Sequence, residues 1–204
     1  MARRALRRRP RPLQDVAVPL SEGLLNEPAE TVGSQMTQDT TLYWVEGPWP
    51  GKLALAARPR GGEWLDDEIS SWQRAGVRSV VSLLTREEEE ELDLVNEAAQ
   101  VKAHRLAFSS FPISDRRVPD SEEKLRTVLE KIDRDLSAGK NVVLHCRQGI
   151  GRTGLVAACL LASKGVNAET ALKQLSAIRG VPIPETTEQR QWIDHYTSNL
   201  ASAK

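Results

Sequence analysis

The sequence predicts an α/β fold, in which a central, mostly parallel sheet is flanked by helices. Short β-branched segments alternate with amphipathic segments from about residue 42 to residue 199. Residues 77–84 are apolar on both faces, which is typical of a buried parallel strand. The chain has 204 residues, of which 40% are hydrophobic and 27% are charged, so it can form a sizeable core.

The first predicted elements are two short strands, at residues 42–45 and 53–57, joined by a Pro- and Gly-rich turn. Leu65, Ile69 and Trp72 follow the spacing i, i+4, i+7 and Gly76 comes next, which predicts an amphipathic helix and its end. The segments after it are predicted as a strand at 77–84, a single acidic helix at 87–100 and a strand at 103–108.

The second half begins with a loop at 109–119 that contains two prolines. Asp120 and Glu123 resemble a capping box, so a helix is predicted from there to about Gly139. The remaining predicted elements are a strand at 141–145 and helices at about 153–164, 167–178 and 187–199.

The domain organisation predicted is a flexible basic N-terminal arm at residues 1–40 and one domain at residues 41–204. Residues 1–14 carry six arginines and no acidic residue, whereas 87–91 is an unbroken acidic run. Two interpretations of the arm stay open: a disordered basic tail, or a segment that docks an acidic partner. The acidic run is interpreted as a solvated helix face.

The composition narrows the function classes. The formal net charge is zero, so no nucleic-acid partner is expected. No apolar run reaches the ~18 residues of a membrane span. The two cysteines, Cys146 and Cys159, form no disulfide framework and favour a reducing compartment, so we expect a cytoplasmic protein. A monomer is expected.

The segment most informative about function follows the strand at 141–145 and reads C-R-Q-G-I-G-R-T-G. A loop closed in this way directs successive backbone N–H groups inward and forms an anion site at a helix N-terminus. Arg152 can hold two phosphate oxygens with its planar guanidinium. The same donors and the helix dipole favour the thiolate form of Cys146. The spacing Cys-x5-Arg therefore predicts a cysteine nucleophile beside a phosphate site.

Three other interpretations of this loop are weaker. Gly149, Gly151 and Gly154 also spell G-x-G-x-x-G, but no second strand ending in an acidic residue follows, and Cys146 and Arg152 would have no role in dinucleotide binding. A Walker loop is excluded because no Gly-Lys-Ser/Thr follows. A buried core cysteine would leave the arginine and the glycines at fixed spacing unexplained.

At this point the sequence resembles the Cys-based protein phosphatases with the motif H-C-x5-R-[S/T], and within them the small dual-specificity group. The segments F-P-I-S-D-R-R-V-P-D-S and H-C-R-Q-G-I-G-R-T-G-L-V-A-A-C-L-L are similar to the cyclin-dependent-kinase-associated phosphatases. The likeness covers residues 42–198 as a fold, but it is specific only over 111–163. It implies the cysteine-phosphatase fold and hydrolysis of phosphotyrosine, with phosphoserine and phosphothreonine as further candidates.

The resemblance implies a two-step reaction without cofactor or metal. Cys146 attacks phosphorus to form a phosphocysteine, Asp115 protonates the leaving oxygen, and Thr153 donates its hydroxyl to the departing thiolate. Water then attacks the phosphocysteine. The phosphate is held by the loop residues Arg147, Gln148, Gly149, Ile150, Gly151 and Arg152.

Two aspartates compete for the role of general acid. Asp120 precedes a predicted helix, so N-capping accounts for it. Asp115 lies between prolines with no helix to cap, and it matches the acid of the family's Pro-Ile-x-Asp segment. We therefore assign the acid to Asp115. Arg116 and Arg117 either contact substrate or are exposed.

Three other residues belong to the predicted surroundings of the site. His145 is expected behind the loop, bonding to backbone, and it lacks partners at metal-ligand spacing. Gln189 either holds the hydrolytic water, as glutamines of a Gln-Thr-x-x-Gln loop do in some relatives, or caps a helix with Thr186. Glu185 replaces the first glutamine of that loop, so which residue handles the water stays open. Cys159 is predicted to be an inert core residue, with a redox partner of Cys146 as the alternative.

The leading function is therefore a phosphatase that acts on phosphoprotein substrates. Two alternatives stay open. One is the same chemistry on a non-protein phosphomonoester, such as a phosphoinositide, a nucleotide or an RNA 5′-phosphate. The other is a phosphopeptide-binding module without turnover.

Overall fold

The computed structural model describes residues 41–202, and the predicted basic arm at residues 1–40 lies outside the described residues. Its centre is a five-stranded sheet in the order β1-β2-β5-β3-β4. Only β1 is antiparallel to its neighbour, so the prediction of a mostly parallel sheet is confirmed. The strands are β1 (Tyr43–Val45), β2 (Leu53–Ala57), β3 (Val77–Ser82), β4 (Ala107–Ser110) and β5 (Asn141–Cys146).

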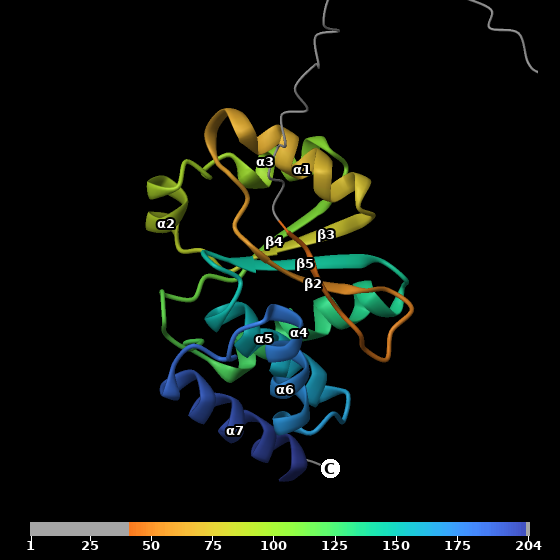
Figure 1. Ribbon diagram of the computed structural model, residues 1–204, viewed down its shortest axis with the longest axis vertical. Helices are drawn as coiled ribbons and strands as arrows, with labels where there is room; N and C mark the ends of the chain where they lie inside the picture. Colours follow the sequence, from red (N-terminus) through yellow and green to blue (C-terminus); the bar gives the residue numbers. More distant parts are fainter. Residues whose placement is uncertain (1–40, 203–204) are drawn as a thin grey trace, which may run out of the picture. The chain divides into compact units, whose positions relative to one another are not determined.

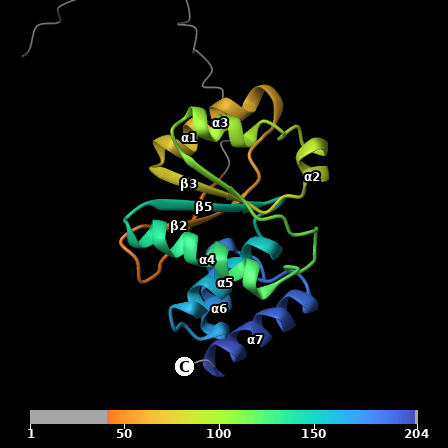
Figure 2. The same ribbon diagram turned by 180° about the vertical axis from the view of Figure 1, so that it is seen from behind.

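Helices cover both faces of this sheet. Figures 1 and 2 show α1 and α3 on one face, α4 to α7 on the other, and α2 near one end of the strands. The helices are α1 (Leu65–Arg74), α2 (Arg86–Glu91), α3 (Glu97–Ala103), α4 (Glu122–Ser137), α5 (Gly151–Ser163), α6 (Ala168–Arg179) and α7 (Thr187–Ser202). A short 3₁₀ helix, Gly62–Trp64, precedes α1.

The hydrophobic core has two layers because side chains of a strand alternate between the faces of the sheet. On β2, Leu53 and Leu55 pack toward α4 and α5, whereas Ala54 and Ala56 pack toward α1 and α3. α5 lies deepest, since every residue from Gly151 to Leu161 is buried. The loop that precedes α5 is consequently fixed at both ends, by a central strand and by a buried helix.

Three predicted boundaries were wrong. The acidic segment forms two helices, because Asp93 adopts a left-handed φ of 57° and the chain turns to bury Leu94. The strand predicted at 103–108 begins only at Ala107, because α3 runs to Ala103 and Arg105 closes it with a φ of 58°. The N-cap of α4 is Ser121 and not Asp120, since the Ser121 hydroxyl accepts the N–H of Lys124 at 3.4 Å.

Candidate active site

Cys146 is the last residue of β5, at the edge of the sheet where the parallel strands end. This is the edge at which α/β proteins bind ligands. The side chain is 3% exposed and lies in register with Ala57, the last residue of β2. Its position therefore comes from the centre of the sheet, which leaves the sulfur little freedom to move.

The loop after Cys146 closes directly on the first turn of α5. Gly149 donates its N–H to Cys146 Sγ at 3.2 Å, so a backbone donor points at the sulfur as predicted. Gly149 has a φ of 68°, and a β-carbon there would lie 2.3 Å from the carbonyl oxygen of Ala56. Only glycine allows this close approach of the loop to β2.

Arg152 lies in the first turn of α5 and its side chain is 2% exposed. The guanidinium donates to both carboxylate oxygens of Glu88, at 2.6 and 2.8 Å. It also donates to the carbonyl of Ile113 at 2.9 Å and to Asp115 Oδ1 at 2.9 Å. A buried cation with this many acceptors is held in one orientation.

Cys146 and Arg152 share one small pocket of about 30 Å³, which we call the Cys146 pocket. It is lined by Asp115, Cys146, Arg147, Gln148, Gly151, Arg152 and Glu185. The structure therefore brings together the predicted nucleophile, the predicted cation and the predicted acid. It adds Glu185, whose part in the chemistry the sequence left open.

The pocket distinguishes the two aspartates. Asp115 lines it and has a side chain that is 54% exposed, so the carboxylate can reach both Arg152 and solvent. Asp120 is exposed, caps no helix and does not line the pocket. The prediction that Asp120 caps the helix was therefore wrong. The assignment of the general acid to Asp115 stays a prediction, which the geometry of the pocket supports.

The neighbours of Asp115 are tied to the segment before α7. Arg116 pairs with Glu185 at 3.3 Å and Arg117 pairs with Glu188 at 3.5 Å. Both arginine side chains are largely exposed, at 64% and 70%. They are thus exposed and ion-paired in the structure, and whether they also contact substrate stays open.

Gln189 is fully buried and its amide is engaged. Its Oε1 accepts the N–H groups of Glu185 and Thr186 at 3.2 and 3.3 Å, and Thr186 Oγ1 accepts the N–H of Gln189. Its Nε2 donates to the carbonyl of Arg117 at 3.1 Å. This is the capping arrangement, so the geometry favours Gln189 as a support of the loop and not as a holder of water.

The residues on either side of the loop are buried. The His145 ring lies on the far side of the sheet, with Nε2 at 2.8 Å from Glu97 Oε1. The two side chains are in close contact but form no hydrogen bond, and among residues 41–200 neither ring nitrogen of His145 has the predicted bond to backbone. Thr153 Oγ1 is buried with no hydrogen-bond partner among residues 41–200, which leaves it free to donate to sulfur.

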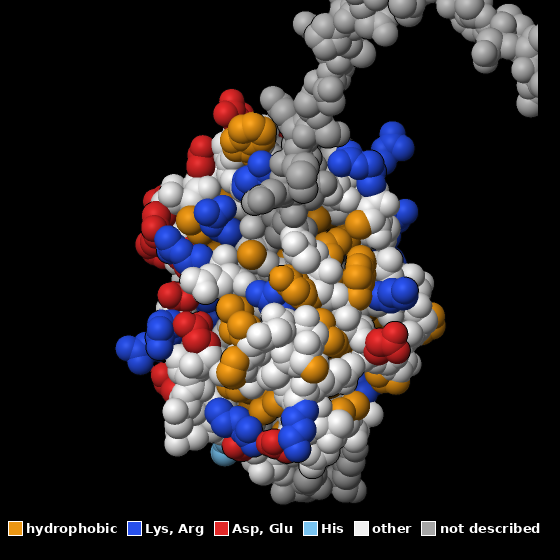
Figure 3. All heavy atoms as spheres, in the orientation of Figure 1, with side chains coloured by type: hydrophobic (Ala, Val, Ile, Leu, Met, Phe, Trp, Pro, Cys, Tyr) orange, Lys and Arg blue, Asp and Glu red, His pale blue; other side chains and the backbone are white. Residues whose placement is uncertain are grey.

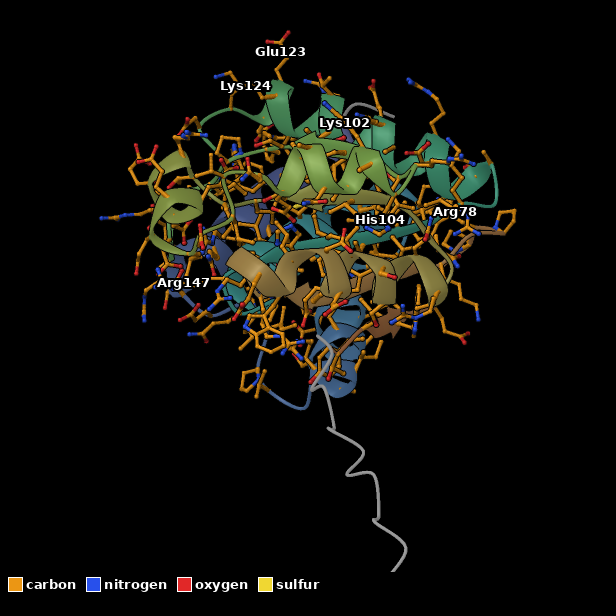
Figure 4. All side chains as sticks on the ribbon, turned by 90° about the horizontal axis from the view of Figure 1, so that it is seen from above. Arg78, Lys102, His104, Glu123, Lys124 and Arg147 are labelled. Carbon is orange, nitrogen blue, oxygen red and sulfur yellow. The ribbon has the colours of Figure 1, made fainter. Side chains whose placement is uncertain are left out.

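Charges at the rim of the pocket are paired with one another. Arg147 donates to both carboxylate oxygens of Glu91, at 2.5 and 3.0 Å, and this bonding lowers the pKa of Glu91. Figure 4 shows Arg147 on the side of the molecule that carries α2, opposite Arg78. Figure 3 shows acidic and basic side chains intermixed along that edge.

Glu88 is the site residue that sequence reasoning missed, because it lies within the acidic run interpreted as a solvated face. Its side chain is 9% exposed. Burial would raise the pKa of Glu88, but hydrogen bonds from Arg152 and from the Thr85 N–H outweigh it, so the pKa is lowered. The pattern Thr85-x-x-Glu88 directly after a strand is a capping box, and it could have placed Glu88 at the same edge as Cys146.

The second cysteine fits the core interpretation. Cys159 is buried in the middle of α5, and burial raises the pKa of its thiol well above the usual range. Both cysteines are free.

Within the described part of the chain, no group of three or more potential ligands could hold a metal ion. None of the described helices is both long and apolar enough to cross a membrane.

Comparison with known proteins points to one family. The profile described as "Polymorphic toxin system, DSP-PTPase phosphatase" matches residues 55–166, which is more than half of the chain. The cyclin-dependent kinase inhibitor 3 of Rattus norvegicus is 26% identical over 140 residues, covering 68% of this chain and 66% of that protein. The putative tyrosine phosphatase 067L of Invertebrate iridescent virus 3 is 36% identical over 101 residues, covering 47% and 38%.

A solved structure shares the fold. The kinase associated phosphatase with serine in place of its catalytic-site cysteine superposes with a TM-score of 0.74. It is 21% identical and covers 80% of this chain and 97% of its own. The described fold, the Cys146 pocket and the profile match agree, and the chain belongs to the DSP-PTPase phosphatases, the family of dual-specificity and tyrosine phosphatases.

Proposed function

We propose that this protein is a protein phosphatase that hydrolyses phosphotyrosine, and also phosphoserine and phosphothreonine, through a phosphocysteine on Cys146. The observation that carries the proposal is that Cys146, whose Sγ accepts the Gly149 N–H, and Arg152 line the same pocket. A thiol among such donors is a nucleophile toward an anion that the same donors hold.

In the proposed first step the Cys146 thiolate attacks phosphorus and the bond from phosphorus to the substrate oxygen breaks. Arg152 and the loop N–H groups stabilise the charge on the non-reacting phosphate oxygens. Asp115 gives its proton to the leaving oxygen. Asp115 accepts from Arg152 at 2.9 Å in the structure, so substrate phosphate would replace the carboxylate on that nitrogen and release it for proton transfer.

In the proposed second step water attacks the phosphocysteine, the bond from phosphorus to sulfur breaks and the thiolate leaves. Asp115 now takes the proton of the water, and the Thr153 hydroxyl donates to the leaving sulfur. Glu185 lines the same pocket, and it is better placed than the engaged Gln189 to contact that water. The second step thus rests on carboxylates and a hydroxyl of this chain alone.

The charges around the pocket support a substrate with a single phosphate. Arg147, Arg116 and Arg117 each pair with a glutamate, so these three cations are less available to hold further phosphates. This pairing disfavours polyphosphorylated inositols. The two free cysteines suit a reducing compartment such as the cytoplasm, which we propose as the location.

The test is a panel of substrates assayed with the unmodified chain. We expect kcat/KM for phosphotyrosine peptides to exceed that for inositol phosphates, nucleotides and RNA 5′-phosphate. A Cys159→Ser variant is the matched control and should retain activity. Faster turnover of an inositol phosphate than of any phosphopeptide would overturn the substrate class. Absence of all turnover, with phosphopeptides bound, would identify a binding module.

A further inference from the structure

Arg179, the last residue of α6, contacts the back of the catalytic loop. Its Nε donates to the carbonyl of Gly149 at 2.8 Å, and its Nη2 donates to the carbonyl of Gln148 at 3.0 Å. One guanidinium therefore binds the oxygens of two successive peptide groups. Arg179 does not line the Cys146 pocket, so it approaches the loop from outside.

These two contacts fix the direction in which the loop donors point. In a trans peptide the C=O and the following N–H point to opposite sides. The Gln148 carbonyl turns toward Arg179, and the Gly149 N–H accordingly points the other way, to Cys146 Sγ at 3.2 Å. The Gly149 carbonyl also turns toward Arg179, which directs the Ile150 N–H to the side away from that guanidinium. Successive N–H groups turned to one side form an anion-binding nest.

The guanidinium is itself held by an aromatic ring. Arg179 Cζ lies 3.8 Å from the centroid of the Tyr43 ring, in β1, which is stacking distance for a cation over an aromatic face. Gly180 follows with a left-handed φ of 70° and ends α6 at this point. The side chain is thus fixed between the edge strand and the loop and is not a freely moving surface arginine.

We propose that Arg179 is a positioning residue for the phosphate-binding loop: it turns the Gly149 and Ile150 N–H groups toward the Cys146 pocket, and Tyr43 holds it in place. This inference deepens the proposed function, because the donors it orients are those that would hold the phosphate. Loss of Arg179 frees the two peptide groups to rotate, and the site then loses preorganised donors without losing Cys146, Arg152 or Asp115.

The experiment measures phosphate binding separately from turnover. In the Cys146→Ser background, binding of inorganic phosphate is measured by calorimetry with and without Arg179→Met. We expect affinity about tenfold weaker in the double variant, and kcat/KM about 10²-fold lower for Arg179→Met alone. Arg179→Lys keeps the charge but cannot bind both carbonyls with one planar group, so intermediate values are expected.

The matched control is Arg78→Met. Arg78 also donates to backbone carbonyls, those of Val77 and Gln73, but at the opposite end of the sheet. It should change neither phosphate binding nor kcat/KM. Tyr43→Phe, which keeps the ring, should behave as the parent, whereas Tyr43→Leu should weaken phosphate binding by about two- to fivefold.

Phosphate affinity and kcat/KM of Arg179→Met within about twofold of the parent, at equal thermal stability, would overturn the inference. Where Arg179→Met does not fold, Arg179→Lys provides the same comparison. The proposed phosphatase function is tested independently, because it is overturned if the unmodified chain shows no turnover. In that case the comparison of phosphate binding between Cys146→Ser and the double variant still tests the role of Arg179.

Discussion

Two carboxylates bind the same guanidinium, and the regions that supply them differ. Glu88 comes from α2, is 9% exposed and makes two bonds to Arg152. Asp115 comes from the loop before α4, is 54% exposed and makes one. A buried two-point contact fixes the cation, whereas an exposed single contact can be exchanged for a phosphate oxygen. The difference separates a residue that fixes Arg152 from the residue that we propose as the proton donor.

The largest effect is expected from Asp115→Asn, which removes the proton donor and keeps the shape. For substrates with poor leaving groups, kcat/KM should fall by about 10²–10⁴-fold, and aryl phosphates with good leaving groups should lose much less. Thermal stability should hardly change because the side chain is half exposed. Asp120→Asn is the control and should leave kcat/KM unchanged for all substrates. An equal loss for all substrates would argue against the acid role.

Glu88→Ala tests the other half of the comparison. It leaves the buried Arg152 without its main counter-charge, so the free energy of unfolding should fall by about 3–5 kcal/mol. Glu90→Ala on the same helix removes an exposed partner of Arg86 and should cost at most about 1 kcal/mol. Chemical denaturation measures both values. Similar losses of unfolding free energy in the two variants would mean that Glu88 does not hold Arg152 in place.

Glu88 should also contribute to the pH dependence of the free energy of unfolding, with a smaller effect than that of Glu88→Ala. Its pKa in the folded chain lies below the ordinary 4.5, so the ionised carboxylate stabilises the fold above that pH. This contribution is lost as the pH falls below 4.5 and through the lowered pKa. Glu88→Gln should therefore show a shallower fall of melting temperature with acid than the parent chain. Identical acid profiles would contradict the lowered pKa.

The smallest effect is expected from Arg116→Gln, which breaks an exposed pair with Glu185. Exposed pairs contribute roughly 0–1 kcal/mol, and 1 kcal/mol corresponds to about fivefold, so kcat/KM should change by about fivefold or less. Steady-state kinetics on a phosphotyrosine peptide measure it. A tenfold loss would show that Arg116 binds substrate directly, which is the other interpretation that the sequence allowed.

Features that depend on local spacing were predictable from the sequence. The strand before Cys146, the glycines and Arg152 lie within one short segment whose backbone geometry the residue types require. β2 was predicted with its observed bounds because a Pro- and Gly-rich turn precedes this short apolar segment. The family follows from the same segment, and both fold class and family are confirmed.

Features that depend on contacts distant in sequence were not predictable in the same way. Glu88 and Arg152 are 64 residues apart, and although the capping box with Thr85 marks the start of a helix, it does not reveal the contact between Glu88 and Arg152. Arg179 similarly reaches the loop from 30 residues away. The break between α2 and α3 escaped prediction because periodicity does not reveal a left-handed residue such as Asp93.

Nucleophilic attack by Cys146 can be tested by trapping the covalent phosphoenzyme intermediate. The chain is mixed with a ³²P-labelled phosphotyrosine peptide, quenched in acid during turnover and digested. We expect the label on the peptide that contains Cys146, and neither label nor turnover in Cys146→Ser. Turnover without protein-bound phosphate, or hydrolysis by Cys146→Ser at the parent rate, would contradict nucleophilic attack by this sulfur.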